Sequence, residues 1–551
     1  MKMTISKKWG LLLLLAVLAA PVAQACTSFL VGKKASACGS AFITYNQDSY
    51  GMFGRLLYYP AADHAPGTMR RIVDGDTNTF HGEIAEAPHT YAVMGYINEH
   101  QVAITETTFG GREELVDPKG ILDYVSLMTV ALQRSRTARE AIDVMTSLVQ
   151  EYGYASEGES FSIADPNEVW ILEMIGKGPN EKGAVWVAVR IPDDCISCHA
   201  NQSRIHRFDL KDKKNVRYAK DVITFARKQG FFNGKDADFS FADAYAPADF
   251  GALRYCEARV WSFYNKWVDG MDRYLDAVDG KHIGQTEPMP LYMKPKQKLS
   301  LADVMNSMRD HYEGTPFDVT QDVGAGPYCA PYRPTPLAWE HEGKKYFNER
   351  PISTQQTAGT YVIQVRDFLP NEIGGVLWFG NDDPNMVAYT PVYCCAKSAP
   401  ACYDPKDAND VTFSWQSAFW VENWVANMTY PRYSQLFPSL KEAREELEKD
   451  FIAYQATVEK QAAELLRYDA DRAVAYLTDY SHSCASRMMD RWIKLGQYLI
   501  VKYNDQTVKP ETDGKFDLTP DGLAVPPQRP GFSEEYKKVI IKETGEKYRV
   551  P

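Results

Sequence analysis

The stretch Ala23-Gln-Ala-Cys-Thr-Ser-Phe-Leu-Val31 lies where the chain changes character. Before it, three lysines precede an apolar run at 11–20, and the small residues that follow are typical of a secretory signal peptide with its cleavage site. After it, the run at 27–31 has the composition of a buried β-strand. We therefore expect residues 1–25 to be removed, so that the mature chain begins with Cys26 at the head of a strand.

This leader sets the compartment that the sequence predicts. Removal by signal peptidase would leave the protein in the periplasm or secreted. Lipid attachment to Cys26 is a weaker alternative, because lipoprotein signals favour a large aliphatic residue three positions earlier, where Ala23 stands here. An oxidising compartment would also permit disulfides among the ten cysteines.

Composition and charge narrow the class of protein further. The 551 residues are 45% hydrophobic and 24% charged, which is typical of a globular chain with a large core. The net charge of −11 makes nucleic acid an unfavourable partner, and it becomes more negative when the leader and its lysines are removed. The leader's apolar run is shorter than the roughly 20 residues of a membrane span, so we expect none.

The order of predicted elements indicates a mixed α/β fold. Strand patterns dominate 26–205, around one predicted helix at 122–149, and strands return at 359–368 and 374–379 after a mixed segment. Helical periodicity covers 439–503, after a capping-box signal at Ser439. We divide the chain into a leader (1–25), a catalytic domain (26–435), a helical region packed on it (436–504) and an extended tail (505–551).

The placement of Cys26 points to chemistry. A structural disulfide would explain a cysteine anywhere, but not a cysteine at the cleavage site. An N-terminal cysteine carries its own base, because its α-amine has a reference pKa of about 7.7–8.0. Before cleavage that nitrogen is an amide and cannot accept a proton. Removal of the leader would therefore also activate the nucleophile.

Several blocks of the sequence resemble the dipeptidase A and secernin family of N-terminal-nucleophile hydrolases. These blocks, which occur in the family's order between Cys26 and Tyr503, are 26–36, 45–49, Ser160–Trp170, His199–Ile205, Arg259–Trp261 and Ile373–Phe379. The resemblance implies an αββα four-layer sandwich with the nucleophile on the first strand. It also implies hydrolysis of dipeptides or short peptides that have a free amino terminus.

The resemblance also suggests roles for three residues. Asp48 would orient and tune the amine of Cys26, although a carboxylate in a turn is its plainer interpretation. Asn201 would donate to the oxyanion, unless its amide is purely structural. Arg259 would stabilise the thiolate and the acyl intermediate, with a surface salt bridge as the alternative.

Two departures from the related acylases concern the substrate. Tyr45 stands where many relatives have arginine, and Thr108 stands where the acylases present an asparagine. Glu106, in the same stretch as Thr108, is a candidate to pair with the ammonium group of a substrate, which would favour dipeptides over acylated amides.

Other cysteine motifs suggest cofactors less strongly. Cys195-Ile-Ser-Cys198-His199 matches a c-type haem attachment signature, but it overlaps the block that begins at His199, and a local disulfide or two separate bridges are favoured. A zinc site at Cys394, Cys395 and Cys402 lacks a second half-site, so disulfides in a loop are favoured there. We expect no cofactor and no metal.

The sequence thus predicts an exported cysteine dipeptidase, and a homo-oligomer is compatible with it. One rival is an amidase acting on conjugated or acylated small molecules. The other is a lipid-anchored or haem-bearing binding protein without hydrolytic activity.

Overall fold

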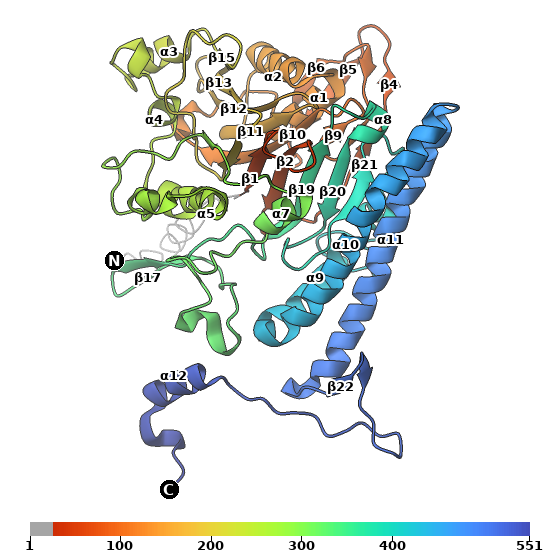
Figure 1. Cartoon of the computed structure of the whole chain (residues 1–551). Coiled ribbons are helices and arrows are strands. Elements are labelled where there is room, and N and C mark those ends of the chain that lie inside the picture. Colours follow the sequence, from red (N-terminus) through yellow and green to blue (C-terminus); the bar gives the residue numbers. More distant parts are fainter. Residues whose placement is uncertain (1–25, 76) are drawn as a thin grey trace, which may run out of the picture.

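A computed structural model of the chain describes residues 26–75 and 77–551. The predicted signal peptide at 1–25 therefore lies outside the described residues. Within them the chain is a mixed α/β protein with two large antiparallel sheets (Figure 1). This confirms the mixed α/β class that the order of predicted elements indicated.

The first large sheet contains the strand that begins just after Cys26. In spatial order its strands are β16 (Tyr292–Met293), β14 (Ile196–His199), β1 (Ser28–Val31), β2 (Ala41–Asp48), β19 (Thr357–Val365), β20 (Val376–Gly380) and β21 (Thr390–Tyr393). The short strand β1 lies inside the sheet, with β14 and β2 antiparallel on its two sides. Its four residues are fully buried, as expected for an apolar strand covered on both faces.

The second large sheet is a meander over most of its width. In spatial order its strands are β15 (Val216–Tyr218), β13 (Ala184–Ile191), β12 (Val169–Gly176), β11 (Gly158–Ala164), β10 (Ala103–Gly110), β9 (Ile97–Asn98), β8 (Val93–Met94) and β3 (Tyr58–Tyr59). Its strand β10 contacts both β1 and β2, and β11 also contacts β2, so the two sheets pack against each other near Cys26.

Helices cover the outer faces of both sheets. On the second sheet, α1 (Tyr124–Arg134) and α2 (Ala138–Tyr152) contact β10 to β13. On the first sheet, α10 (Tyr433–Leu466) and α11 (Ala470–Tyr503) contact β21, and Figure 1 shows them as a long antiparallel pair beside it. Each large sheet therefore has helices packed against it.

The remaining elements are shorter. The other helices are α3 (Val222–Gln229), α4 (Phe241–Tyr245), α5 (Ala258–Trp267), α6 (Leu275–Val278), α7 (Leu301–Ser307), α8 (Asn371–Gly374), α9 (Ala418–Thr429) and α12 (Glu534–Thr544). Four two-stranded sheets complete the elements of the described residues: β4 (Ala62–Asp63) with β7 (His89–Thr90), β5 (Met69–Val73) with β6 (Phe80–Ala85), β17 (Ala338–His341) with β18 (Lys344–Phe347), and β22 (Glu511–Thr512) with β23 (Lys515–Phe516). No helix within the described ranges combines the length and apolarity that crossing a bilayer requires.

Two predicted helices differ in the structure. The single helix predicted at 122–149 is two helices, because Ser135 ends α1 in an extended conformation and the Thr137 side chain caps the start of α2. The helical region predicted to begin at Ser439 instead begins at Tyr433, and Pro438 lies within the first two turns of α10. Pro438 is the sixth residue of this helix, so it removes one hydrogen bond to the carbonyl four residues earlier.

The predicted disulfides are wrong. All ten cysteines lie among the described residues, and each is a free thiol. Cys195 immediately precedes strand β14, which contains Cys198, and side chains three positions apart along extended chain point to opposite faces. A local bridge between these two cysteines is therefore not formed.

Candidate active site

Cys26 is held at the junction of the two sheets. Its neighbour Thr27 exchanges backbone hydrogen bonds with Asn46 of β2, with N···O distances of 3.3 and 2.9 Å. The Cys26 side chain is only 2% exposed. The first strand thus places this thiol in the interior, beside β2 and β10.

Two side chains from these neighbouring strands contact the sulfur. Cys26 Sγ lies 3.7 Å from the Tyr45 hydroxyl and 3.6 Å from Glu106 Oε1, and the Tyr45 hydroxyl donates to the same carboxylate oxygen. Burial raises the pKa of the Cys26 thiol well above its usual value, and the nearby charges of Glu106 and Asp48 raise it further. The thiol in this arrangement needs a base before it can act as a nucleophile.

Arg259 holds the main chain of Cys26 rather than its sulfur. From α5, its guanidinium donates to the Cys26 carbonyl oxygen at 2.6 Å and to Thr27 Oγ1 at 2.7 Å. Arg259 is completely buried, so the alternative of a surface salt bridge is wrong. These contacts differ from the predicted thiolate contact, because the hydrogen bonds to Cys26 and Thr27 go to oxygen atoms and not to the Cys26 sulfur.

Asp48 ends strand β2 and is buried rather than placed in an exposed turn. Arg350 Nη2 donates to its Oδ2 at 2.9 Å, and Thr357 Oγ1 donates to its Oδ1 at 2.6 Å. Burial raises the pKa of Asp48 to about 6, against the opposing effects of Arg350 and Thr357. The Asp48 backbone N–H also hydrogen-bonds to the Cys26 thiol and favours its ionised form.

Asn201 lies on the turn that follows β14, with a positive φ of 62°. Its Oδ1 accepts from Arg259 at 3.0 Å, and its Nδ2 donates to the Thr108 carbonyl oxygen at 2.7 Å. Arg259 therefore links Asn201 to Cys26, and the predicted residues form one connected network. Hydrogen bonds at both its oxygen and its nitrogen therefore fix the orientation of the Asn201 side-chain amide.

Three residues of this site were missed by the sequence analysis. Arg350 and Thr357 hold the Asp48 carboxylate, and Glu159, opposite Thr108 on β11, accepts a hydrogen bond from the Thr108 hydroxyl at 2.7 Å. Arg350 lies in a loop and carries no local signal. Glu159 does carry one, since an acidic residue inside an otherwise uncharged buried strand is rarely without a role.

The haem motif does not fit its surroundings. His199 lies on β14, and both of its ring nitrogens are 2.7 Å from hydroxyl groups, those of Thr107 and Ser162. Burial lowers the pKa of this histidine to about 3. Haem attachment would need both cysteines and the histidine around one ligand, whereas a strand points neighbouring side chains to opposite faces.

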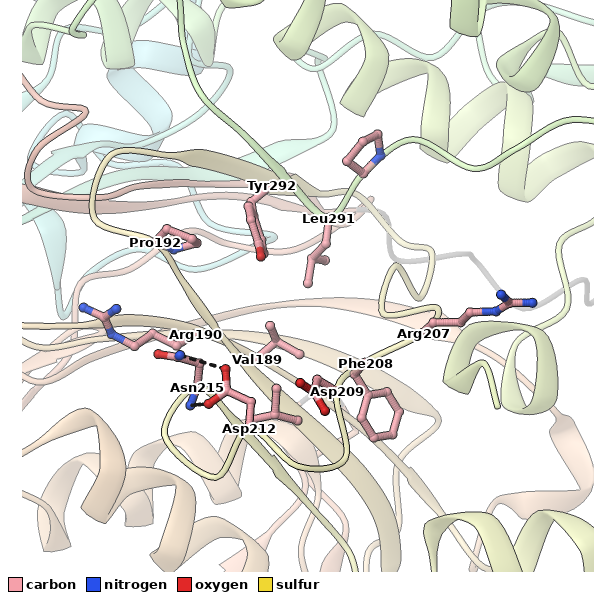
Figure 2. A pocket seen from close by; sticks show the side chains of 12 residues that line it. Val189, Arg190, Pro192, Arg207, Phe208, Asp209, Asp212, Asn215, Leu291 and Tyr292 are labelled. Carbon is pink, nitrogen blue, oxygen red and sulfur yellow. Dashed lines mark hydrogen bonds between the residues drawn. The ribbon is translucent and has the colours of Figure 1, made fainter. Parts of the chain in front are cut away.

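Two other places in the described residues have features of a ligand site. Within the described residues, the group of metal-ligating type is Asp276, Asp279 and His282, which lies at the surface in and after α6, and no zinc group forms at the cysteines near 394. A cavity of about 540 Å³ opens between the edges of the two sheets, where Arg190, Asp212 and Tyr292 contribute to its wall (Figure 2). None of the predicted site residues lines this cavity.

Comparisons with known proteins identify relatives of this chain. A probable dipeptidase from Salmonella dublin is 29% identical over 390 residues, covering 67% of this chain and 81% of that protein. A probable dipeptidase from Latilactobacillus sakei is 26% identical, covering 84% of this chain and 92% of its own, and dipeptidase A from Lactobacillus helveticus is 26% identical, covering 76% and 85%.

The sequence profile of Peptidase family C69 matches residues 55–446, most of the chain, and begins shortly after Cys26 and Asp48. This confirms the family that the motifs indicated and the hydrolase class. The chain belongs to Peptidase family C69 and is a peptidase.

Proposed function

We propose that this chain is an exported cysteine dipeptidase that cleaves dipeptides or short peptides with a free amino terminus. In this proposal residues 1–25 are a signal peptide, the mature protein is periplasmic or secreted, and Cys26 becomes both first residue and nucleophile. The arrangement of two packed sheets, each with helices packed against it, supports an N-terminal-nucleophile αββα sandwich, with 26–435 as its catalytic domain.

The observation that carries the proposal is the contact between Cys26 and Glu106. In a dipeptide one carbon atom separates the amino nitrogen from the scissile carbonyl carbon. A substrate whose carbonyl reaches the Cys26 sulfur must therefore place its ammonium group within a few ångströms of that sulfur. Glu106 Oε1 lies 3.6 Å from the sulfur, where it can pair with this group.

The reaction would use the α-amine that cleavage before Cys26 releases. The amine takes the thiol proton, the sulfur attacks the carbonyl carbon, and the amine then returns the proton to the leaving amino group. Water activated by the same amine hydrolyses the resulting thioester and restores the thiol. The raised pKa of the thiol makes this neighbouring base necessary.

Other residues would prepare the site for these steps. Arg259 fixes the Cys26 carbonyl, which holds the amine and the sulfur in one orientation. Asp48 supplies a buried negative charge that would stabilise the protonated amine. Asn201, held by Arg259, would contribute to stabilising the oxyanion.

Two measurements test the proposal. The intact mass and N-terminal sequence of the purified native protein should show an unmodified chain that begins at Cys26. A chain that begins elsewhere, or that carries a lipid or haem mass, would contradict the mechanism.

A substrate panel tests the specificity. Free dipeptides should be hydrolysed and their N-acetylated counterparts should not, whereas an amidase would prefer the acylated compounds. Cys26→Ser should lose turnover while the protein is still exported and folded, and full activity in this variant would exclude Cys26 as the nucleophile.

A further inference from the structure

The side chain of Glu106 is one of two acidic side chains on the same face of neighbouring strands. On β10, Glu106 and Thr108 are alternate residues and share a face, and Thr108 lies directly opposite Glu159 of β11. Both glutamates are completely buried. Two carboxyl groups therefore lie together in the interior, next to the Cys26 thiol.

Direct interactions connect the two carboxyl groups to the site. The Thr108 hydroxyl donates to Glu159 Oε1 at 2.7 Å, and the Tyr45 hydroxyl donates to Glu106 Oε1. The negative charge of Glu106 also disfavours the ionised form of Glu159. Two carboxyl groups can hydrogen-bond to each other only when one of them carries a proton.

The titratable groups that interact with the pair are phenols, a carboxyl group and a thiol, which are either neutral or negatively charged. The tyrosines that interact electrostatically with the pair are Tyr45 from β2, Tyr96 from the turn before β9 and Tyr154 from the segment after α2; the acid is Glu157, and Cys26 is the thiol. Burial and the charge of Glu106 raise the pKa of Glu159 well above its usual value. Two buried carboxyl groups side by side disfavour a second negative charge.

We propose that Glu106 and Glu159 form a single-proton carboxyl pair that exchanges its proton for the ammonium group of the substrate. This inference rests on the proposed dipeptidase function and assigns Glu159 as a positioning residue that acts through Glu106. The empty pair carries one proton and one negative charge. When the ammonium group enters, the proton leaves to solvent and both carboxylates face one positive charge, so the total charge of the cluster is unchanged.

This exchange explains how a deeply buried acid can select a cation. A single buried carboxylate would be costly to leave unpaired whenever the site is empty. In the pair, the protonated carboxyl group donates a hydrogen bond that stabilises the remaining negative charge, and a ligand that brings its own positive charge can replace this proton. An N-acetylated dipeptide brings none and would leave the proton in place.

The test is to count protons during binding. Mature Cys26→Ala protein is titrated with a free dipeptide in a calorimeter at neutral pH, in two buffers of different ionisation enthalpy. The difference in heat gives the protons released. We expect close to one proton per bound dipeptide, and none in Cys26→Ala combined with Glu159→Gln, because the glutamine amide can donate to Glu106 in place of the shared proton and so leave Glu106 ionised in the empty site.

A matched control uses another buried acid. Glu422, on α9, is also completely buried, and burial and the charge of Asp382 raise its pKa well above its usual value. Glu422→Gln in the Cys26→Ala background should leave proton release unchanged. Circular dichroism checks that each variant is folded, and Glu159→Asp, which keeps a titratable carboxyl group, should restore release if it folds where the glutamine variant does not.

The outcomes separate this inference from the proposed function. Tight binding of the free dipeptide without proton release, or equal release in the Glu159→Gln variant, overturns the carboxyl pair and leaves the dipeptidase proposal standing. Equal binding of free and N-acetylated dipeptides, or no binding of either, contradicts both. Turnover by Cys26→Ala would refute the nucleophile alone, because proton release could still be measured with a peptide that is not cleaved.

Discussion

Asp48 and Glu106 are both buried carboxyl groups close to Cys26, but their charges are balanced in different ways. Asp48 ends strand β2 and faces a cation, since Arg350 and Thr357 hold its two oxygens. Glu106 faces Tyr45 and a second acid, Glu159. Asp48 therefore has its counter-ion within the protein, whereas in the proposed site the ammonium group of a substrate would supply the counter-ion of Glu106.

This difference teaches how one small site can contain a fixed charge and an adjustable one. A charge needed in every turnover is best paired within the protein. A carboxyl group needed only for recognition can stay protonated until its partner binds. The following substitutions act on one side of Cys26 or on the other.

The largest effect is expected from removing the cation beside Asp48. Arg350→Met should lower the free energy of unfolding by about 3–5 kcal/mol, because it leaves a buried carboxylate without its partner. Denaturant titration measures this loss. Arg350→Lys keeps the charge and should lose less, and equal stability of the methionine variant and the parent would show that Asp48 does not need this arginine.

A smaller effect is expected on the recognition side. Glu106→Gln should raise the KM for free dipeptides by roughly 10–100-fold, the equivalent of about 1.5–3 kcal/mol for a charged hydrogen bond. Steady-state kinetics measures it, and the weak binding of an N-acetylated dipeptide, which has no ammonium group, is the internal reference. The assignment of Glu106 would be wrong if both ligands lost affinity equally.

The pH dependence reports the state of Asp48. Because its pKa is about 6, kcat/KM should fall on the acid side of about pH 6, by roughly tenfold per pH unit. The folded pKa lies above the usual value of 3.8, so the folded chain binds the proton first, and this group's contribution to stability decreases as pH rises from about 3.8 to about 6. An acid limb at the same pH in Asp48→Asn would assign it to another group.

The smallest change concerns one hydrogen bond. Thr357→Val removes the donor to Asp48 Oδ1, which favours the ionised form, so the acid limb should move to higher pH by less than one unit, for a bond of about 1 kcal/mol. Thr360→Val is the matched control on the same strand, since the Thr360 hydroxyl donates to Asn46 rather than to Asp48. A shift of equal size in both variants would mean that strand packing, and not this bond, sets the pKa.

The sequence was informative where function depends on residue order. Cys26, Asp48, Asn201 and Arg259 lie in recognisable blocks, and the structure brings all four near one another. The mixed α/β class followed from the alternation of strand and helix patterns. Those signals are local, so they can be read from short segments.

The parts that could not be predicted depend on long-range packing. Arg350 meets Asp48 across 302 positions of the chain, and nothing in its own segment marks it as buried. The disulfides were predicted wrongly because cysteine spacing says nothing about the direction of each side chain. Once Cys198 is placed on a strand, its distance from Cys195 in sequence no longer implies a bridge.

The hydrogen bond from Arg259 to the Cys26 carbonyl oxygen would hold the amino-terminal end of the mature chain in place. The first residues of most domains fray, because little holds them. In a chain beginning at Cys26, the first carbonyl group would instead be hydrogen-bonded to the buried Arg259 guanidinium. The second residue, Thr27, would be paired with β2. Trimming back to this residue would therefore expose a reactive terminus that is already immobile, with no folding step left between the cut and the first catalytic event.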